Sequence, residues 1–305
     1  MSKFVSVVAG ALVTTVLVAG CSSPDEGADA RAQSAIDVSV TLDEENGTIV
    51  LPYDRFIPDR VDASLLQTAQ QVVATLCARE QGVGFMTGRF VEIPTYRSEP
   101  FYGPWTLAQA ERYGFVSPFL TDADLRANGI VPEDYGSPSL LNNAEVAAVN
   151  EKLTDEDRAV VEECYRSPER AEFTVKGGGG PWDDELRQAE EPILAGETLT
   201  EPLDELYACY RERGLEPDTA RPGLVVGADP GRIDEEQVAL AVQTVECKQE
   251  TDFTRRVADA LAAAQAEVLL DYADEVVAQG EELQRALDAA QRYVAAHPEA
   301  FEPPA

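Results

Sequence analysis

Apolar residues recur at every third or fourth position along several stretches of the chain, and this spacing predicts helices. The first such stretch covers residues 63–80 and ends before Gly82, a residue suited to stopping a helix. Similar stretches cover residues 201–213, which precede Gly214, and begin again near Asp234, where Gln237 is expected to complete a cap. The pattern therefore predicts a mainly α fold. The apolar positions of the first helix are Leu65, Leu66, Ala69, Val72, Val73 and Leu76.

The longest uninterrupted pattern covers residues 252–296, where Gly280 is almost the only helix breaker. At 1.5 Å per residue one helix of this length would approach roughly 65 Å. Its apolar stripe repeats about every 3.7 residues, which does not predict a regular left-handed coiled coil. Such a helix must protrude, pair with another chain or fold back. The stripe consists of Phe253, Val257, Leu261, Ala264, Val268, Tyr272, Val276, Leu283, Leu287, Ala290 and Val294.

Short sequence patterns predict the positions of the remaining elements. Residues 38–42 alternate in polarity, Asn46-Gly47 favours a tight turn, and residues 48–51 are mostly apolar, so a short N-terminal β-hairpin is expected. Residues 298–305 are expected to be disordered. Helix starts are predicted at capping sequences, namely Thr106 with Gln109, Thr121 with Asp124, Asn143 and Thr154. Trp105 and Trp182 are interpreted as packing residues, each leading into a short helix.

The first 20 residues have the pattern of a secretory leader. Lys3 precedes an apolar run of about 16 residues, which is short for a membrane span. The run ends in Val18-Ala19-Gly20-Cys21, which resembles the bacterial lipobox. The resemblance implies cleavage before Cys21 and a lipid on its thiol; the alternative is an uncleaved membrane anchor. Residues 21–35 would then form a flexible tether.

Export changes the interpretation of the four other cysteines, Cys77, Cys164, Cys209 and Cys247. An even number of cysteines in an oxidising compartment favours disulfides. Chain order and a repeated motif favour Cys77–Cys164 and Cys209–Cys247 among the three possible connectivities. A zinc site is the alternative, although the close Cys-x-x-Cys spacing typical of such sites is absent. Loops of these lengths predict a stabilisation of about 4 to 4.6 kcal/mol for each disulfide.

Residues 36–297 are therefore expected to form one disulfide-stapled helical domain. The glycine run at residues 177–180 divides it into two pseudo-halves, 36–175 and 181–297. That run lacks the Gly-Lys-Ser/Thr ending of a phosphate-binding loop, so a flexible connection is the preferred interpretation.

The repeated motif is Cys-x-Arg-Glu-x-Gly, at residues 77–82 and 209–214. In each copy the arginine lies in the last helical turn, where a cation stabilises the free carbonyl groups. Arg79 and Arg211 are therefore expected to act as C-terminal caps beside a disulfide. A recognition role for Arg79, Glu80, Arg211 and Glu212 is the alternative hypothesis.

Charge and composition reduce the number of function classes that fit this chain. The formal net charge is −32, which disfavours nucleic acid and favours neutral or basic partners. The one histidine, His297, argues against Ser-His-Asp and Cys-His catalysis and against most histidine-ligated metal sites. Acidic groups at residues 183–185 and at Asp122 and Asp124 fit helix starts better than a catalytic pair or a calcium loop. We therefore expect no enzymatic activity and no cofactor.

The lipobox, the two motif copies and the later Glu-Cys pairs at Cys164 and Cys247 resemble a group of uncharacterised actinobacterial lipoproteins. The resemblance implies a protein on the outer face of the cell membrane, with a possible accessory role beside an ABC-type transporter. We expect it to bind or scaffold a protein or cell-wall partner through residues 252–296. Two alternatives are a solute-binding lipoprotein, which usually alternates strands and helices, and a carboxylate-dependent cell-wall hydrolase.

Overall fold

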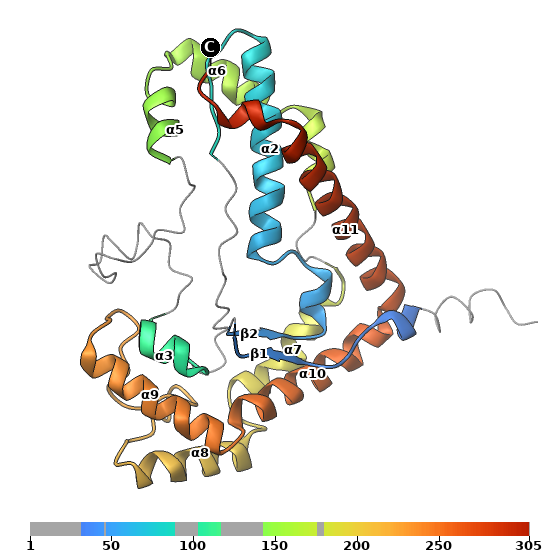
Figure 1. The fold of residues 1–305 in the computed structure, drawn as a ribbon. Coiled ribbons are helices and arrows are strands. Elements are labelled where there is room, and N and C mark those ends of the chain that lie inside the picture. Colours follow the sequence, from blue (N-terminus) through green and yellow to red (C-terminus); the bar gives the residue numbers. More distant parts are fainter. Residues whose placement is uncertain (1–31, 46, 89–102, 117–142, 176–179, 305) are drawn as a thin grey trace, which may run out of the picture.

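Helices form most of the chain in the computed structural model, which confirms the expected mainly α class (Figure 1). The structure describes residues 32–45, 47–88, 103–116, 143–175 and 180–304. The leader, Cys21, the predicted cap at Thr121 and Asp124, and residues 177–179 of the glycine run lie outside these ranges.

The predicted hairpin is present but shorter than the polarity pattern indicates. Strand β1 (Thr41–Asp43) pairs antiparallel with β2 (Thr48–Val50), and Gly47 in the turn has a φ of +64°. The strand begins after Ser39, because the side chain of Asp37 accepts hydrogen bonds from both the backbone N–H and the hydroxyl of Ser39. The pairing with the second strand starts two residues later, with Thr41 opposite Val50. The 3₁₀ helix η1 (Tyr53–Phe56) follows directly.

Capping residues begin the helices of the first part of the chain. Asp59 caps α2, Thr106 caps α3 and Thr154 caps α6, each within a reciprocal capping box, so the predicted starts at Thr106 and Thr154 are confirmed. Gly82, with a φ of +82°, follows the end of α2 as predicted. The elements are α2 (Arg60–Glu80), α3 (Leu107–Tyr113), α5 (Asn143–Asn150), α6 (Asp155–Cys164) and η2 (Pro168–Phe173).

The next helices are α7 (Asp183–Leu194), α8 (Thr200–Glu212) and α9 (Glu235–Glu250). Asp234 caps α9 as expected, but the side chain of Gln237 does not complete the cap. It accepts from the backbone N–H of Asp229 and donates to the carbonyl of Gly227, so it fixes the preceding loop instead. Trp105 and Trp182 are both buried at the starts of short helices, and their predicted packing role is confirmed.

The final apolar stretch is two helices rather than one straight rod. α10 (Phe253–Asp271) and α11 (Ala273–Ala296) meet at Tyr272, which has φ −113° and ψ 30°. The Tyr272 ring lies 5.9 Å from that of Trp182, and its hydroxyl donates to Glu185 at 2.6 Å. These contacts with α7 accompany the break. Gly280, the expected weak point, lies inside α11, where an added Cβ would come within 2.8 Å of Phe56.

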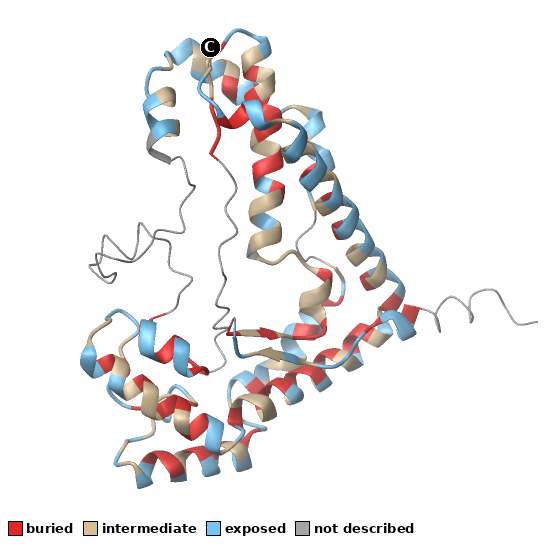
Figure 2. Cartoon of the chain, in the orientation of Figure 1, coloured by how far each residue is buried: buried red, intermediate tan, exposed pale blue. Residues whose placement is uncertain are grey.

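Because of this bend the chain folds back, and α11 runs along α2 (Figure 1). The apolar stripe faces inward along both helices, while the outward positions are exposed (Figure 2). Every member of the stripe is buried or half-buried against other parts of the same chain. The stripe is therefore core, and its apolar side chains do not form an open docking surface.

Packing crosses the predicted boundary between the two pseudo-halves. Helix α2 lies against α11, and α3 lies against α9. One hydrophobic cluster combines Ile49 and Trp105 from the first half with Leu206 and Leu261 from the second. The two halves therefore share much of their core, although the cluster around Cys77 and Cys164 is formed by the first half alone.

Both ends of the described chain are more structured than expected. Residues 32–35 of the predicted tether are helical, and Ala32 and Ile36 are buried beside Val276. The predicted disordered tail forms the 3₁₀ helix η3 (Pro298–Phe301), with Ala300 and Phe301 buried against Val72 of α2. In both places a few apolar side chains find a place in the core, which composition alone does not reveal.

Candidate functional site

Two disulfides join neighbouring helices in closely similar ways. Cys77–Cys164 links α2 to α6, and Cys209–Cys247 links α8 to α9. The Cα atoms are 5.7 Å apart in each pair. This is the connectivity that chain order favours. Glu250 lies 3.4 Å from the sulfur of Cys209, close enough for a shared metal site, but sulfurs bonded to each other offer no thiolate ligand.

The helix ends that carry the two motif copies have the same backbone geometry. Gly82 and Gly214 both adopt positive φ, +82° and +76°. The next residue in each case donates back to the helix, Val83 to Ala78 at 2.9 Å and Leu215 to Tyr210 at 2.8 Å. These bonds define a Schellman motif. The repeated motif is thus a helix end that turns sharply just after a disulfide.

The side chain of Arg79 makes hydrogen bonds to other parts of the same chain. Its guanidinium donates to three carbonyl oxygens, those of Phe85 at 2.8 Å, Glu299 at 2.6 Å and Glu302 at 2.6 Å. Two of these belong to the C-terminal segment around η3, so Arg79 holds that segment against the end of α2. Partial burial lowers the pKa of Arg79 from its ordinary value. The neighbouring Glu80 is exposed.

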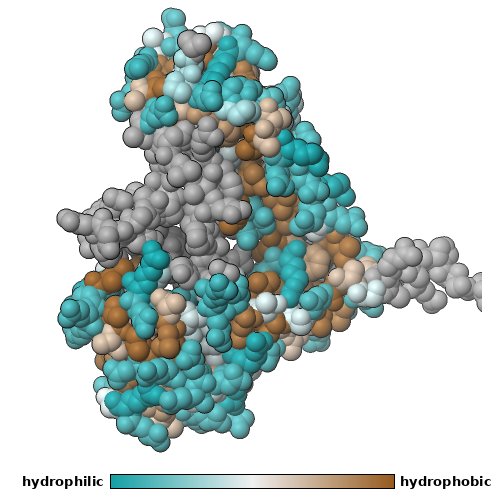
Figure 3. Space-filling view, in the orientation of Figure 1, coloured by the Kyte–Doolittle hydropathy of each residue, from teal (hydrophilic) through white to brown (hydrophobic). Residues whose placement is uncertain are grey.

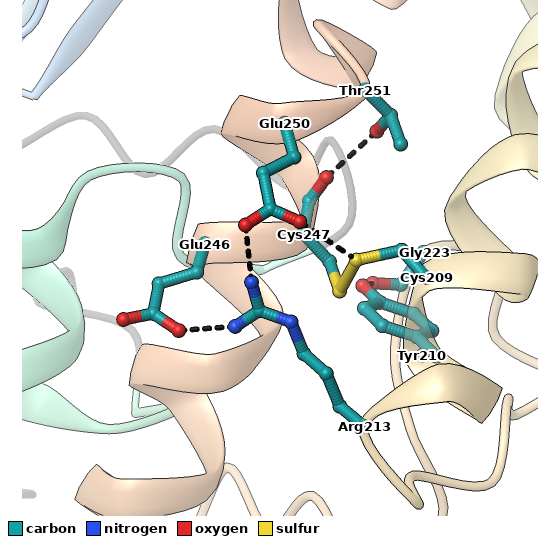
Figure 4. Close-up of a disulfide and its surroundings, with 8 residues drawn as sticks. All are labelled: Cys209, Tyr210, Arg213, Gly223, Glu246, Cys247, Glu250 and Thr251. Atoms are coloured by element: carbon teal, nitrogen blue, oxygen red, sulfur yellow. Dashed lines mark hydrogen bonds and ion pairs between the residues drawn. A yellow bond between two sulfur atoms is a disulfide. The ribbon is translucent and has the colours of Figure 1, made fainter.

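The second motif copy does not repeat this contact, because Arg211 and Glu212 are both exposed. The shared feature lies two residues after the arginine, at a position that sequence reasoning missed. Gln81 donates to Cys164 Sγ at 3.2 Å and to Cys77 Sγ at 3.5 Å. The equivalent Arg213 bridges Glu246 and Glu250 across the second disulfide (Figure 4).

The signal for this position was the motif spacing itself. A residue four positions after the cysteine lies one helical turn further along the same face. In the first copy this side chain reaches the disulfide sulfurs, and in the second it reaches Glu246 and Glu250 on the helix that carries Cys247. The four residues singled out for recognition do not come together as one site: Arg79 is bound within the fold, and Arg211 lies on the other disulfide-linked helix pair.

A groove of about 420 Å³ lies between η1 and α7. Trp182 Nε1 donates to the hydroxyl of Tyr53 at 3.0 Å, and this hydroxyl lies 3.1 Å from Asp183 Oδ1, to which it donates. The bonds fix the tyrosine ring at one end of the groove. The groove is lined by Tyr53, Ile57, Pro58, Asp183, Leu186, Arg187 and Glu190.

Gln265 of α10 fixes the other end. Its side-chain amide donates to Glu190 at 2.6 Å and accepts from the backbone N–H of Tyr53 at 2.9 Å. Burial raises the pKa of the Glu190 carboxyl, and the nearby charge of Asp54 raises it further. The pKa shift of Glu190 is opposite in direction to those of Asp37, Asp157, Asp218 and Glu299, which are all lowered. The sequence analysis did not single out Glu190.

The raised pKa predicts how Glu190 affects stability. Below the ordinary carboxyl value of 4.5 the group is protonated in both the folded and unfolded states. As the pH rises through the higher folded-state pKa, its contribution to the free energy of unfolding is lost. Glu190→Gln keeps an oxygen that accepts from Gln265. We expect this variant to melt at a higher temperature than the wild type at neutral pH, with the difference vanishing below about pH 4.5.

Thermal melts followed by circular dichroism across this pH range check the expectation. The matched control is Glu191→Gln, which makes the same charge change at the adjacent, exposed position of α7. An equal rise in melting temperature in both variants would mean that the stabilisation comes only from the lower net charge. The burial of the charged Glu190 carboxylate would then not destabilise the fold by itself.

Lys248 is a second unusual titratable group. It is 1% exposed, and its ammonium group donates to the carbonyl of Pro104 at 2.8 Å. Burial lowers its pKa to about 7. The contact ties α9 to the backbone just before Trp105, so we interpret Lys248 as a structural residue.

The fold and these sites define a mainly helical protein with two disulfide-linked helix pairs and a small groove lined by both acidic and apolar side chains. Comparison with known protein families, curated proteins and solved structures finds no match to the chain. Within the described ranges no helix combines the length and the apolar character needed to cross a membrane.

Proposed function

We propose that the chain is a non-enzymatic, lipid-anchored envelope protein outside the cell membrane, where it binds or scaffolds a protein or cell-wall partner. The observation that carries the proposal is the pair of disulfides, Cys77–Cys164 and Cys209–Cys247, built into the helical frame. Stable disulfides are typical of exported proteins. Together with the lipobox ending at Cys21, they favour export followed by lipid attachment. An accessory role beside an ABC-type transporter is part of the same proposal.

The partner surface that we propose is the outward face of α11. The apolar stripe of this helix packs inside the chain, so a partner would meet its polar side, which is hydrophilic in the space-filling view (Figure 3). Five acidic side chains and two arginines, Arg285 and Arg292, are exposed on α11, so its surface is net acidic and favours a partner with a basic surface, bound in a salt-dependent way. Its exposed acidic residues are Asp274, Glu275, Glu281, Glu282 and Asp288.

Crosslinking in intact cells tests this surface. A photoreactive amino acid at Glu282 or Asp288 of α11 should capture the same partner, identified by mass spectrometry. The same group at Glu156, an exposed acidic position on α6, serves as the control. Capture from α6 but not from α11 would place the partner on another face and refute this part of the proposal.

Attachment is tested separately. Metabolic labelling with an alkyne fatty acid should mark the wild-type chain, and Cys21→Ser should abolish the label. Equal labelling of the two chains would overturn lipid attachment at Cys21.

A further inference from the structure

The groove between η1 and α7 has a lining with a definite order. Asp183, Leu186 and Glu190 lie at the first, fourth and eighth positions of one helical stripe, so a carboxylate, an apolar side chain and a carboxylate follow one another along it. The seven-residue separation of the two acids corresponds to about 10 Å along the helix axis. Ile57 and Pro58 widen the apolar part from the opposite side.

Both acids are held in place by neighbours. Asp183 accepts from the hydroxyl of Tyr53, which Trp182 fixes in turn, and Glu190 accepts from Gln265. Gln265 is 3% exposed, so Glu190 is anchored from inside the core. Residues that are oriented by such bonds lose little conformational freedom when a ligand binds.

The charge around the groove favours a cation. Asp54 lies close enough to Glu190 to affect its titration, which adds a third acid. Arg187 also lines the groove, but its guanidinium is bonded to the exposed Asp184 at 2.6 Å, so this charge is largely balanced. The ring of Tyr53 offers a further surface that attracts cations.

The volume of about 420 Å³ lies in the range of small-molecule sites. A ligand matching the lining would carry a positive group at each end and methylene groups between them. We propose that this groove binds a linear diamine or polyamine, with one ammonium group at Asp183 and Tyr53, the carbon chain over Leu186, and the second ammonium group at Glu190. The site is separate from the partner surface on α11, so either proposal can fail without the other.

Isothermal titration of the full, disulfide-bonded chain with cadaverine, a linear diamine, tests the inference. Glu190→Gln should weaken binding roughly tenfold or more, because one charged hydrogen bond is lost. Glu191→Gln, which makes the same charge change outside the groove, should leave the affinity within about twofold of wild type. Equal losses in both variants would show that cadaverine only screens the acidic surface, and would overturn the proposal.

Two further measurements define the ligand chemistry. Arg187→Gln removes a positive charge from the lining and should tighten cadaverine binding; weaker binding would mean that this arginine does not oppose the bound ammonium groups, and would overturn the proposal. Pentylamine and pentane-1,5-diol, compared at the same ionic strength, should bind more weakly than cadaverine. Equal affinity for the diol would mean that ammonium groups are not recognised. Circular dichroism of each variant confirms that it is folded.

Discussion

Replacing Cys77 and Cys164 together by alanine should lower the free energy of unfolding by about 4 to 5 kcal/mol. This disulfide spans 87 residues of chain, so its loss releases a large loop in the unfolded state. It also removes the link between α2 and α6, where Cys164 packs with Ala78 and Val161. Changing both cysteines avoids leaving a single reactive thiol. Urea unfolding without reductant, followed by circular dichroism, gives the measurement.

The second disulfide provides an internal comparison. Cys209–Cys247 spans 38 residues, and the same relation gives about 3.9 kcal/mol for its removal. We therefore expect the Cys77, Cys164 double variant to be the less stable of the two. A loss below about 1 kcal/mol in either double variant would mean that the disulfide adds little to a frame already held by packing.

Arg79→Ala should lower the free energy of unfolding by about 2 to 4 kcal/mol, because three carbonyl oxygens lose a charged donor. Two of these carbonyls, of Glu299 and Glu302, lie beside the buried Ala300 and Phe301. The C-terminal segment should therefore open before the rest of the chain. Urea unfolding measures the overall loss, and carboxypeptidase digestion should remove residues from the variant faster than from the wild type.

The motif provides a matched control for this prediction. Arg211→Ala changes the equivalent arginine of the second copy, which is exposed, and should alter stability by no more than about 0.5 kcal/mol. A similar loss in both variants would mean that the shared helix-end position matters, and that the bonds to the C-terminal segment do not.

Local sequence signals predicted much of this fold. Capping sequences such as Thr106 with Gln109 and Thr154 with Asp157 contain all the atoms that they use, so they could be read directly. The disulfide pairing also followed from chain order and the repeated motif. In each case the contacts involved are close in sequence or are marked by a repeated residue pattern.

Features that depend on distant residues could not be predicted. The helix break at Tyr272 comes with contacts to Trp182 and Glu185 of α7, whereas the local sequence marked Gly280 as the weak point. The order of the C-terminal tail depends on Arg79, more than 200 residues earlier in the chain. Tertiary packing outweighed local propensity in both places.

The candidate groove could not be predicted from the sequence either, because its residues are far apart along the chain. Tyr53 and Asp183 are 130 residues apart, and Glu190 meets Gln265 across 75 residues. In the sequence, Asp183 belongs to an acidic helix start, and nothing marks Glu190. Only the fold brings the aromatic ring, the two acids and the apolar strip to one surface.

The placement of the two disulfides has a mechanical consequence. Each covalent bridge ties a helix to a partner in its own region, α2 to α6 or α8 to α9, and no bridge spans the seam where α11 lies along α2. That seam is held by apolar packing and, at its C-terminal end, by the hydrogen bonds from Arg79 to the carbonyls of Glu299 and Glu302. Since a disulfide survives until it is reduced, a pull that separates α11 from α2 would break only non-covalent contacts, and both linked helix pairs would stay joined.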